Sequence, residues 1–409
     1  MIDRPLYTNR VFTESVAPSA KLLTGMKRAG KSSVMQMARD ELTRRGAPKQ
    51  SIIHLSFEGL ENSGITESAE LYDAVTKRVA AAPDAGRIYL FLDEPQRVYG
   101  WERAALHLMH DLGVYIYAAG SNSDIVSPSV LATLEDRCEI INVTTLSFTE
   151  YLIFRESFTR IEDIQRELAR YIMQGGFPTL HLREHTQDEA YTHVRDIMSA
   201  AVWSDVVGSH QLRRADQLTR IIRFVFENVG RTFSAKHLSD SLKGENKEIN
   251  IETVYTYLER LENAYIISRC RRYDLHAEEP LKTQEKFYLA DVGLRFAMLG
   301  FSPTAIGNAL ENTVYLELVR RGYEVYIGKH GKREIDFVAQ RGNERVYIQL
   351  GREVHPERTE NDAYNTLAAL RDNYPKYILS ADPNASGNRN GIETASITDF
   401  LLGGGHIRV

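Results

Sequence analysis

Residues 25–32 read Gly-Met-Lys-Arg-Ala-Gly-Lys-Ser, which is a complete G-x-x-x-x-G-K-[ST] phosphate-binding loop. The apolar pair Leu22-Leu23 precedes the loop, and residues with helical spacing follow it, so the motif has the strand–loop–helix context that it requires. Its glycines let backbone N–H groups surround phosphate oxygens, and the start of the helix adds partial positive charge. The pattern favours a nucleotide-binding site over a chance match.

The loop and the first helical turn predict individual nucleotide contacts. Lys31 is expected to reach the β- and γ-phosphates, and the Ser32 hydroxyl is expected to hold Mg²⁺. The other predicted nucleotide-binding residues are Gly25, Arg28, Ala29, Gly30 and Ser33. The cofactors that this site predicts are ATP or ADP together with Mg²⁺.

Two carboxylates follow the apolar run Leu90-Phe91-Leu92. In a parallel sheet the carboxyl end of such a strand lies beside the phosphate loop. Asp93 is therefore predicted as a metal ligand together with Ser32, and Glu94 is predicted to activate the attacking water. The alternative is a solvated strand end, but the pairing with the phosphate loop favours catalysis.

A polar pair ends the next predicted strand, over residues 114–119. Asn122 is the first candidate for orienting the attacking water, and Ser121 is the second. The alternative for both is a cap on the following helix, since Ser and Asn are good caps.

Arg137 lies where a predicted helix gives way to the strand that begins at Cys138. In oligomeric ATPases an arginine at this place meets the γ-phosphate of the neighbouring subunit, so Arg137 is predicted as a catalytic arginine finger. The alternative is an arginine that only stabilises the end of its own helix.

Together these motifs resemble a bacterial and archaeal family of AAA+-superfamily ATPases. In that family an AAA-type core and a helical lid precede a winged helix and a nuclease-like domain of unknown function. The further matching segments span residues 146–151, 175–178, 286–295 and 334–338. Because Arg137 of a neighbouring subunit is predicted to complete the site, a homo-oligomer is expected, either a ring or a filament.

The resemblance also implies an adenine contact in Gly175-Gly176-Phe177-Pro178, where Gly176 and Pro178 are the expected residues. Arg4 is a weaker candidate for bordering the base. The residues alone indicate no more than a Gly/Pro break between helices.

A helix-turn-helix layout with a wing is predicted from a short helix over residues 233–242, a helix over 251–264 and a strand over 265–270. Possible partners are DNA or a protein. Candidate DNA contacts are Thr253, Tyr255, Thr256, Arg260, Arg269, Arg271 and Arg272. Three acidic residues of the same helix argue against DNA binding, because acidic side chains repel the phosphate backbone; they are Glu252, Glu259 and Glu262.

The C-terminal segment resembles a restriction-endonuclease-like core whose acidic site is incomplete. Glu311 and Asp336 fill the first two places of the motif, but Gln349 and Gly351 stand where an acid and a lysine are needed. The lost acid and lysine weaken Mg²⁺ binding and charge stabilisation, so we expect this domain to be inactive. Lys329, Lys332 and Arg333 cluster just before Asp336.

The overall expectation is an α/β protein with a P-loop AAA+-type parallel sheet. The predicted segments are the ATPase core (1–147), helical lid (148–207), winged helix (208–280) and nuclease-like domain (281–409). A net charge of −5 does not itself indicate nucleic-acid binding, and two distant cysteines predict neither a disulfide framework nor a metal site. No apolar run is long enough for a membrane span, and the start lacks a secretory signal, so a cytoplasmic location is expected. The leading hypothesis is ATP hydrolysis, and the alternatives are a nucleotide-gated switch and an ATP-regulated nuclease.

Overall fold

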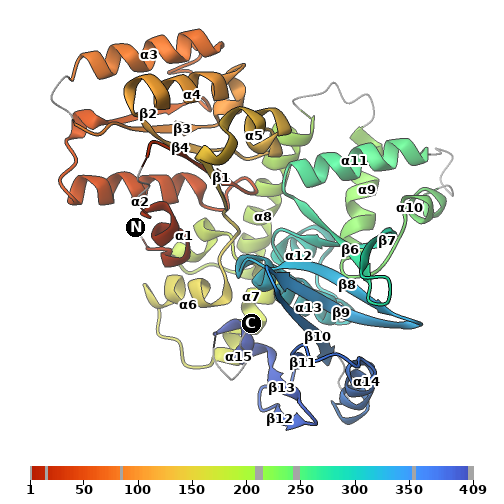
Figure 1. The fold of residues 1–409 in the computed structure, drawn as a ribbon. Coiled ribbons are helices and arrows are strands. Elements are labelled where there is room, and N and C mark those ends of the chain that lie inside the picture. The colour runs from red at the N-terminus through yellow and green to blue at the C-terminus, as the bar shows by residue number, and fades with distance from the viewer. Residues whose placement is uncertain are drawn as a thin grey trace. The chain divides into compact units, whose positions relative to one another are not determined.

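The computed structural model describes residues 2–13, 17–82, 86–207, 215–242, 249–351 and 356–403. It divides into two compact units, one of Met1–Thr144 with Asn263–Tyr265 and one of Thr145–Glu262 with Ile266–Val409 (Figure 1). No helix among the described residues is long and apolar enough to cross a membrane.

The first unit is built on a five-stranded sheet in the order β2-β3-β4-β1-β5, in which every pairing is parallel. The strands are β1 (Ala20–Thr24), β2 (Ile52–Ser56), β3 (Tyr89–Asp93), β4 (Tyr115–Ala119) and β5 (Cys138–Asn142). This confirms the predicted parallel sheet. All five strands therefore direct their carboxyl ends toward the same edge, where such sheets bind ligands.

Helices cover both faces of this sheet (Figure 1). They are α1 (Pro5–Val11), α2 (Lys31–Arg44), α3 (Ser68–Ala80), α4 (Trp101–Leu112) and α5 (Pro128–Leu134), with 3₁₀ turns η1 (Lys49–Ser51), η2 (Pro95–Arg97), η3 (Ser123–Val126) and η4 (Glu135–Arg137). Successive strand side chains point to opposite faces. Leu90 and Leu92 accordingly pack in the core with α3 and α4, whereas Phe91 packs in a second core with Val34 of α2.

The second unit begins with a run of helices. They are α6 (Phe148–Glu156), α7 (Ile164–Gln174), η5 (Pro178–Leu182), α8 (Gln187–Ala201), the π-helical turn η6 (Val202–Val207), α9 (Ala215–Glu227), α10 (Ala235–Ser241) and α11 (Ile251–Asn263). Side-chain caps explain where several of these helices begin. Ser147 and Glu150 form a reciprocal capping box at α6, and Ser234 caps α10 as its sequence suggests.

The rest of the second unit surrounds an eight-stranded mixed sheet in the order β12-β13-β11-β10-β9-β8-β6-β7. Its strands are β6 (Ile267–Asp274), β7 (Glu279–Leu289), β8 (Glu324–His330), β9 (Arg333–Arg341), β10 (Glu344–Gly351), β11 (Lys376–Ser380), β12 (Ser386–Arg389) and β13 (Ile392–Ser396). The helices are α12 (Gly293–Leu299), η8 (Pro303–Ala305), α13 (Ile306–Arg320), α14 (Pro356–Ala368) and α15 (Ile397–Leu401).

Strands β9 and β10 form an antiparallel hairpin with its turn at residues 342–343. The predicted boundary between the winged helix and the nuclease-like domain, at residues 280/281, falls inside strand β7. Residues 275–278 form the turn of the β6–β7 hairpin, and both strands belong to the same sheet as β8–β13. Turn residues alone do not distinguish a hairpin from a domain linker, which explains the difference.

Candidate nucleotide-binding site

The phosphate loop joins the end of β1 to the start of α2 and depends on its two glycines. Gly25 has φ +134°, and a Cβ there would lie 2.2 Å from the Val143 carbonyl oxygen. Gly30 has φ +107° and forms the N-cap of α2. A side chain would be strained in both conformations, so the tight turn of this loop requires glycine at both positions.

Lys31 is buried, and its ammonium folds back over the loop. The Nζ atom donates to the Gly25 carbonyl at 2.8 Å and to the Met26 carbonyl at 3.0 Å. Ser32 and Ser33 on the first turn of α2 are exposed. The loop therefore presents two hydroxyls outward and holds the Lys31 ammonium against two of its own carbonyls.

Arg4 is hydrogen-bonded to the same loop. Its guanidinium is almost fully buried and donates to the Ala29 carbonyl at 2.8 Å and to the Thr144 carbonyl at 3.0 Å. Arg28, at the tip of the loop, adopts φ +67°. The described contacts of Arg4 thus support the shape of the loop, a role that its distant place in the sequence did not indicate.

Asp93 at the end of β3 meets the first turn of α2. The Ser32 hydroxyl donates to Asp93 Oδ2 at 3.2 Å. Burial, together with repulsion from Glu94, raises the pKa of Asp93 to about 6. A poorly solvated carboxylate beside a hydroxyl is a suitable donor set for Mg²⁺, because a divalent cation would stabilise the ionised form.

Glu94 is held in a defined orientation. Its backbone is in the left-handed region with φ +56°, and its N–H donates to the Ala119 carbonyl at 2.7 Å. The carboxylate oxygen Oε2 accepts from Gln96 Nε2 at 2.7 Å and from the Ser121 hydroxyl at 3.0 Å. The sequence suggested no role for Gln96, although it stands two residues after the acidic pair.

The two candidates at the end of β4 have different contacts. Ser121 hydrogen-bonds to Glu94, as described above. Asn122 is the N-cap of η3, and its side-chain oxygen accepts from the Asp124 N–H at 3.1 Å. The structure therefore brings the second candidate to the acidic pair, while the first makes the capping contact that was its alternative.

Arg137 is exposed and precedes the first residue of β5. Parallel pairing aligns Cys138 with Ala20 at the start of β1, and Asn142 with Thr24 at its end. With a rise of about 3.3 Å per residue, Arg137 lies more than about 13 Å along the sheet from the phosphate loop. The arginine is therefore at the opposite edge from the phosphate loop of its own chain.

Gly176 and Pro178 belong to the second unit, between α7 and α8. The Gly176 N–H donates to Asp291 Oδ2 at 2.7 Å, and its carbonyl accepts from the Leu146 N–H at 2.7 Å. Gly175 has φ +81°, and a Cβ there would lie 1.7 Å from Asp291 Oδ1. The glycine pair thus lets the chain close around a buried aspartate, and Pro178 opens η5.

The residues predicted for the nuclease-like core are tied into the protein. Glu311 is fully buried, and its Oε1 accepts from Lys286 Nζ at 3.0 Å and from the Tyr288 hydroxyl at 2.6 Å. Asp336 Oδ2 accepts from the Leu350 N–H at 2.8 Å. Among the residues that the structure describes, no group of three or more His, Cys, Asp or Glu side chains could hold a metal ion.

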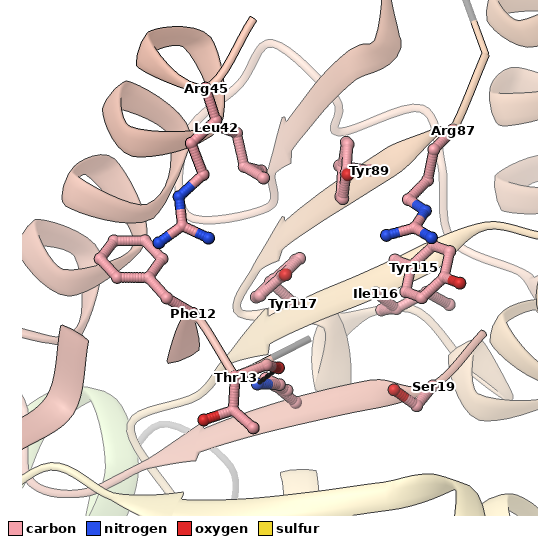
Figure 2. Close-up of a pocket in the computed structure, with 11 residues that line it drawn as sticks. Phe12, Thr13, Ser19, Leu42, Arg45, Arg87, Tyr89, Tyr115, Ile116 and Tyr117 are labelled. Carbon is pink, nitrogen blue, oxygen red and sulfur yellow. Dashed lines mark hydrogen bonds between the residues drawn. The ribbon is translucent and has the colours of Figure 1, made fainter. Parts of the chain in front are cut away.

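A small cavity of about 30 Å³ lies at the amino ends of β3 and β4 (Figure 2). Figure 2 shows the guanidinium groups of Arg45 and Arg87 on opposite sides of it, with Tyr89 and Tyr117 between them. This edge of the sheet is the one that the phosphate loop does not occupy, so the cavity is separate from the nucleotide site.

Comparisons with known proteins agree with this geometry. A family model described as an AAA domain matches residues 17–152, and one described as a domain of unknown function matches residues 165–305. An uncharacterized protein of Haemophilus influenzae is 29% identical over 402 residues, which cover 98% of this chain and 99% of the relative. One of Methanocaldococcus jannaschii is 27% identical over 369 residues, covering 86% and 79%.

Among solved structures, a Walker-type ATPase of Pyrococcus abyssi matches with a TM-score of 0.53 at 14% identity, covering 73% of this chain and 96% of that one. At this identity the likeness concerns the fold. With the AAA-domain match and the geometry of the phosphate loop, it leads to one conclusion. Residues 17–152 match an AAA-domain model and have the fold and the phosphate loop of a P-loop ATPase.

Proposed function

We propose that this protein binds Mg·ATP at the carboxyl edge of the β1–β5 sheet and hydrolyses it there. The observation that carries the proposal is the continuous chain of contacts from Ser32 to Asp93, and from Glu94 to Ser121. Lys31 and the loop N–H groups would hold the phosphates, and Ser32 with Asp93 would hold Mg²⁺. Glu94 would accept a proton from the attacking water while Ser121 and Gln96 fix its orientation.

The active form in this proposal is a homo-oligomer. Arg137 is exposed at the edge of the sheet opposite its own phosphate loop. From there it would meet the γ-phosphate of a neighbouring copy and stabilise charge that develops during transfer. A ring or a filament would place each arginine at the next site.

The second unit is proposed to carry a winged helix in α10, α11 and the β6–β7 hairpin, followed by a nuclease-like core without cleavage activity. Lys286 supports the lack of cleavage, because its ammonium lies 3.0 Å from both Glu311 and Glu334. It thus supplies within the protein the positive charge that a metal ion would supply to Glu311. Gln349 and Gly351 lack the charges that cleavage needs.

The test is a steady-state ATPase assay on variants of the site. Lys31→Ala should lose nucleotide binding, whereas Glu94→Gln should still bind ATP and hydrolyse it at least about 100-fold more slowly. Glu102→Gln on α4 is a matched control, since this glutamate lies in the first turn of that helix and should not change turnover. Full turnover in the Glu94→Gln protein would refute the role given to Glu94.

A nucleotide-gated switch with little turnover is the second candidate. It is favoured by the contacts that two side chains make within the protein. The Lys31 ammonium donates to a loop carbonyl, and the Glu94 carboxylate accepts from Ser121 and Gln96. Measuring turnover and nucleotide release with and without DNA separates the candidates. Stimulated turnover supports the ATPase, whereas tight retention of ATP without turnover supports the switch.

A further inference from the structure

A groove of about 620 Å³ lies within the second unit, separate from the nucleotide site. Helix α11 contributes Tyr255 and Glu259 to its lining, strand β6 contributes Arg271, and strand β8 contributes Glu324 and Tyr326. Tyr255 is 52% exposed despite its large ring. An open groove lined by tyrosines and charged side chains is a feature of peptide- or nucleic-acid-binding surfaces.

The groove opens where two neighbouring strands stop pairing. The parallel ladder between β6 and β8 joins only Arg272–Asp274 with Ile327–Lys329. The register shifts at the start of this ladder in both adjoining ladders, between Cys270 and Arg272 and between Tyr326 and Gly328. The lining residues of both strands lie in the segments that precede the shared ladder, so an extended chain could follow the direction of the strands there.

Ion pairs determine the charge of the groove. Arg269, which also lines it, is neutralised by Glu262 at 2.7 Å and by Glu285 at 3.1 Å. Apart from this paired arginine, the groove is lined by the carboxylates of Glu259 and Glu324 and by the guanidinium of Arg271. The Tyr326 hydroxyl donates to Glu324 Oε1 at 2.5 Å and holds this carboxylate in place. The balance on the lining is therefore acidic.

We propose that this groove binds an extended, cationic segment of a partner protein. Glu259 and Glu324 would pair with arginine or lysine side chains, and the rings of Tyr255 and Tyr326 offer faces for cation–π contacts. The same carboxylates repel a phosphate backbone, which decides against DNA on this face of α11. The proposal does not depend on ATP hydrolysis in the first unit.

The test uses the full chain and a fluorescein-labelled peptide in which arginine and valine alternate over about eight residues. Fluorescence anisotropy should show binding that weakens as salt rises, and a peptide with glutamate in place of arginine should not bind. The double variant Glu259→Lys/Glu324→Lys should weaken the arginine peptide by about 10-fold or more. Glu156→Lys is the matched control, because Glu156 is an exposed glutamate at the end of α6 and does not line the groove.

Two outcomes would overturn the proposal. One is equal affinity of the double variant and the control for the arginine peptide, provided that circular dichroism shows both to be folded. The other is a DNA duplex of about 20 base pairs that binds more tightly than the peptide and loses affinity in Tyr255→Ala and Arg271→Ala. That second result would assign the same face of α11 to nucleic acid.

Discussion

The Ser121 hydroxyl donates a 3.0 Å hydrogen bond to the Glu94 carboxylate, whereas its neighbour Asn122 caps η3. We therefore expect Ser121→Ala to lower the turnover number for ATP by about 10- to 100-fold, because Glu94, the proposed general base, loses an orienting contact. Asn122→Ala should instead cost at most about 1 kcal/mol of stability through the lost cap. Turnover and thermal unfolding are measured on both proteins. The reverse pattern, with turnover lost only in Asn122→Ala, would contradict this assignment.

Arg137 provides a test of action between subunits. Since it lies at the opposite edge of the sheet from its own loop, Arg137→Ala should bind ATP normally and lose about 1,000-fold or more in turnover. Lys31→Ala should be inactive for a different reason. Mixing the two inactive proteins should restore part of the activity, because assemblies then contain intact loops next to intact arginines. Failure of all mixing ratios to restore turnover, with assembly verified by light scattering, would exclude a finger in trans.

The pH dependence of stability should report on Asp291. Burial raises the pKa of its carboxyl to about 6, so the folded protein binds this proton more tightly than the unfolded chain does. The contribution of Asp291 to the free energy of unfolding is therefore greatest at low pH and falls as pH rises through about 6, by about 2 kcal/mol between about pH 4.5 and 7.5.

Urea unfolding of the natural protein and of Asp291→Asn at both pH values isolates this effect, since the other titrating groups are common to the two proteins. The natural protein should lose stability relative to the variant as the pH rises. An equal difference at both pH values would mean that Asp291 does not titrate in this range.

The sequence predicted local elements well where one physical signal was sufficient. The continuous apolar run that ends at Asp93 is a buried parallel strand, and the glycines at 25 and 30 make the loop that their spacing indicated. The β9–β10 hairpin also follows its alternating pattern and turn. In these segments, burial and backbone conformation are encoded within a few neighbouring residues.

Side-chain partners across the chain were harder to predict. Ser121 and Asn122 are adjacent and similar in polarity, so only the direction of each side chain decides which one reaches Glu94. Arg4 supports the Ala29 carbonyl from 25 residues away, and Asp291 closes on Gly176 from 115 residues away. These contacts depend on how distant elements pack, which neither periodicity nor spacing specifies.

The buried contact of Lys286 with Glu311 provides the last test, because it separates a structural role from a metal site. Both side chains are almost fully removed from water, so Lys286→Met alone should destabilise the protein by about 3–5 kcal/mol by leaving a buried charge uncompensated. The double variant Lys286→Met/Glu311→Gln should recover most of this loss, since the amide keeps an acceptor for the Tyr288 hydroxyl.

Chemical denaturation of the natural protein, the single variant and the double variant measures the effect with and without Mg²⁺. If the ion pair has taken the place of a metal site, Mg²⁺ should leave the stability of the double variant unchanged, and none of the three proteins should cleave plasmid DNA. Metal-dependent cleavage that is lost in Asp336→Ala would instead show that a catalytic site survives in the second unit.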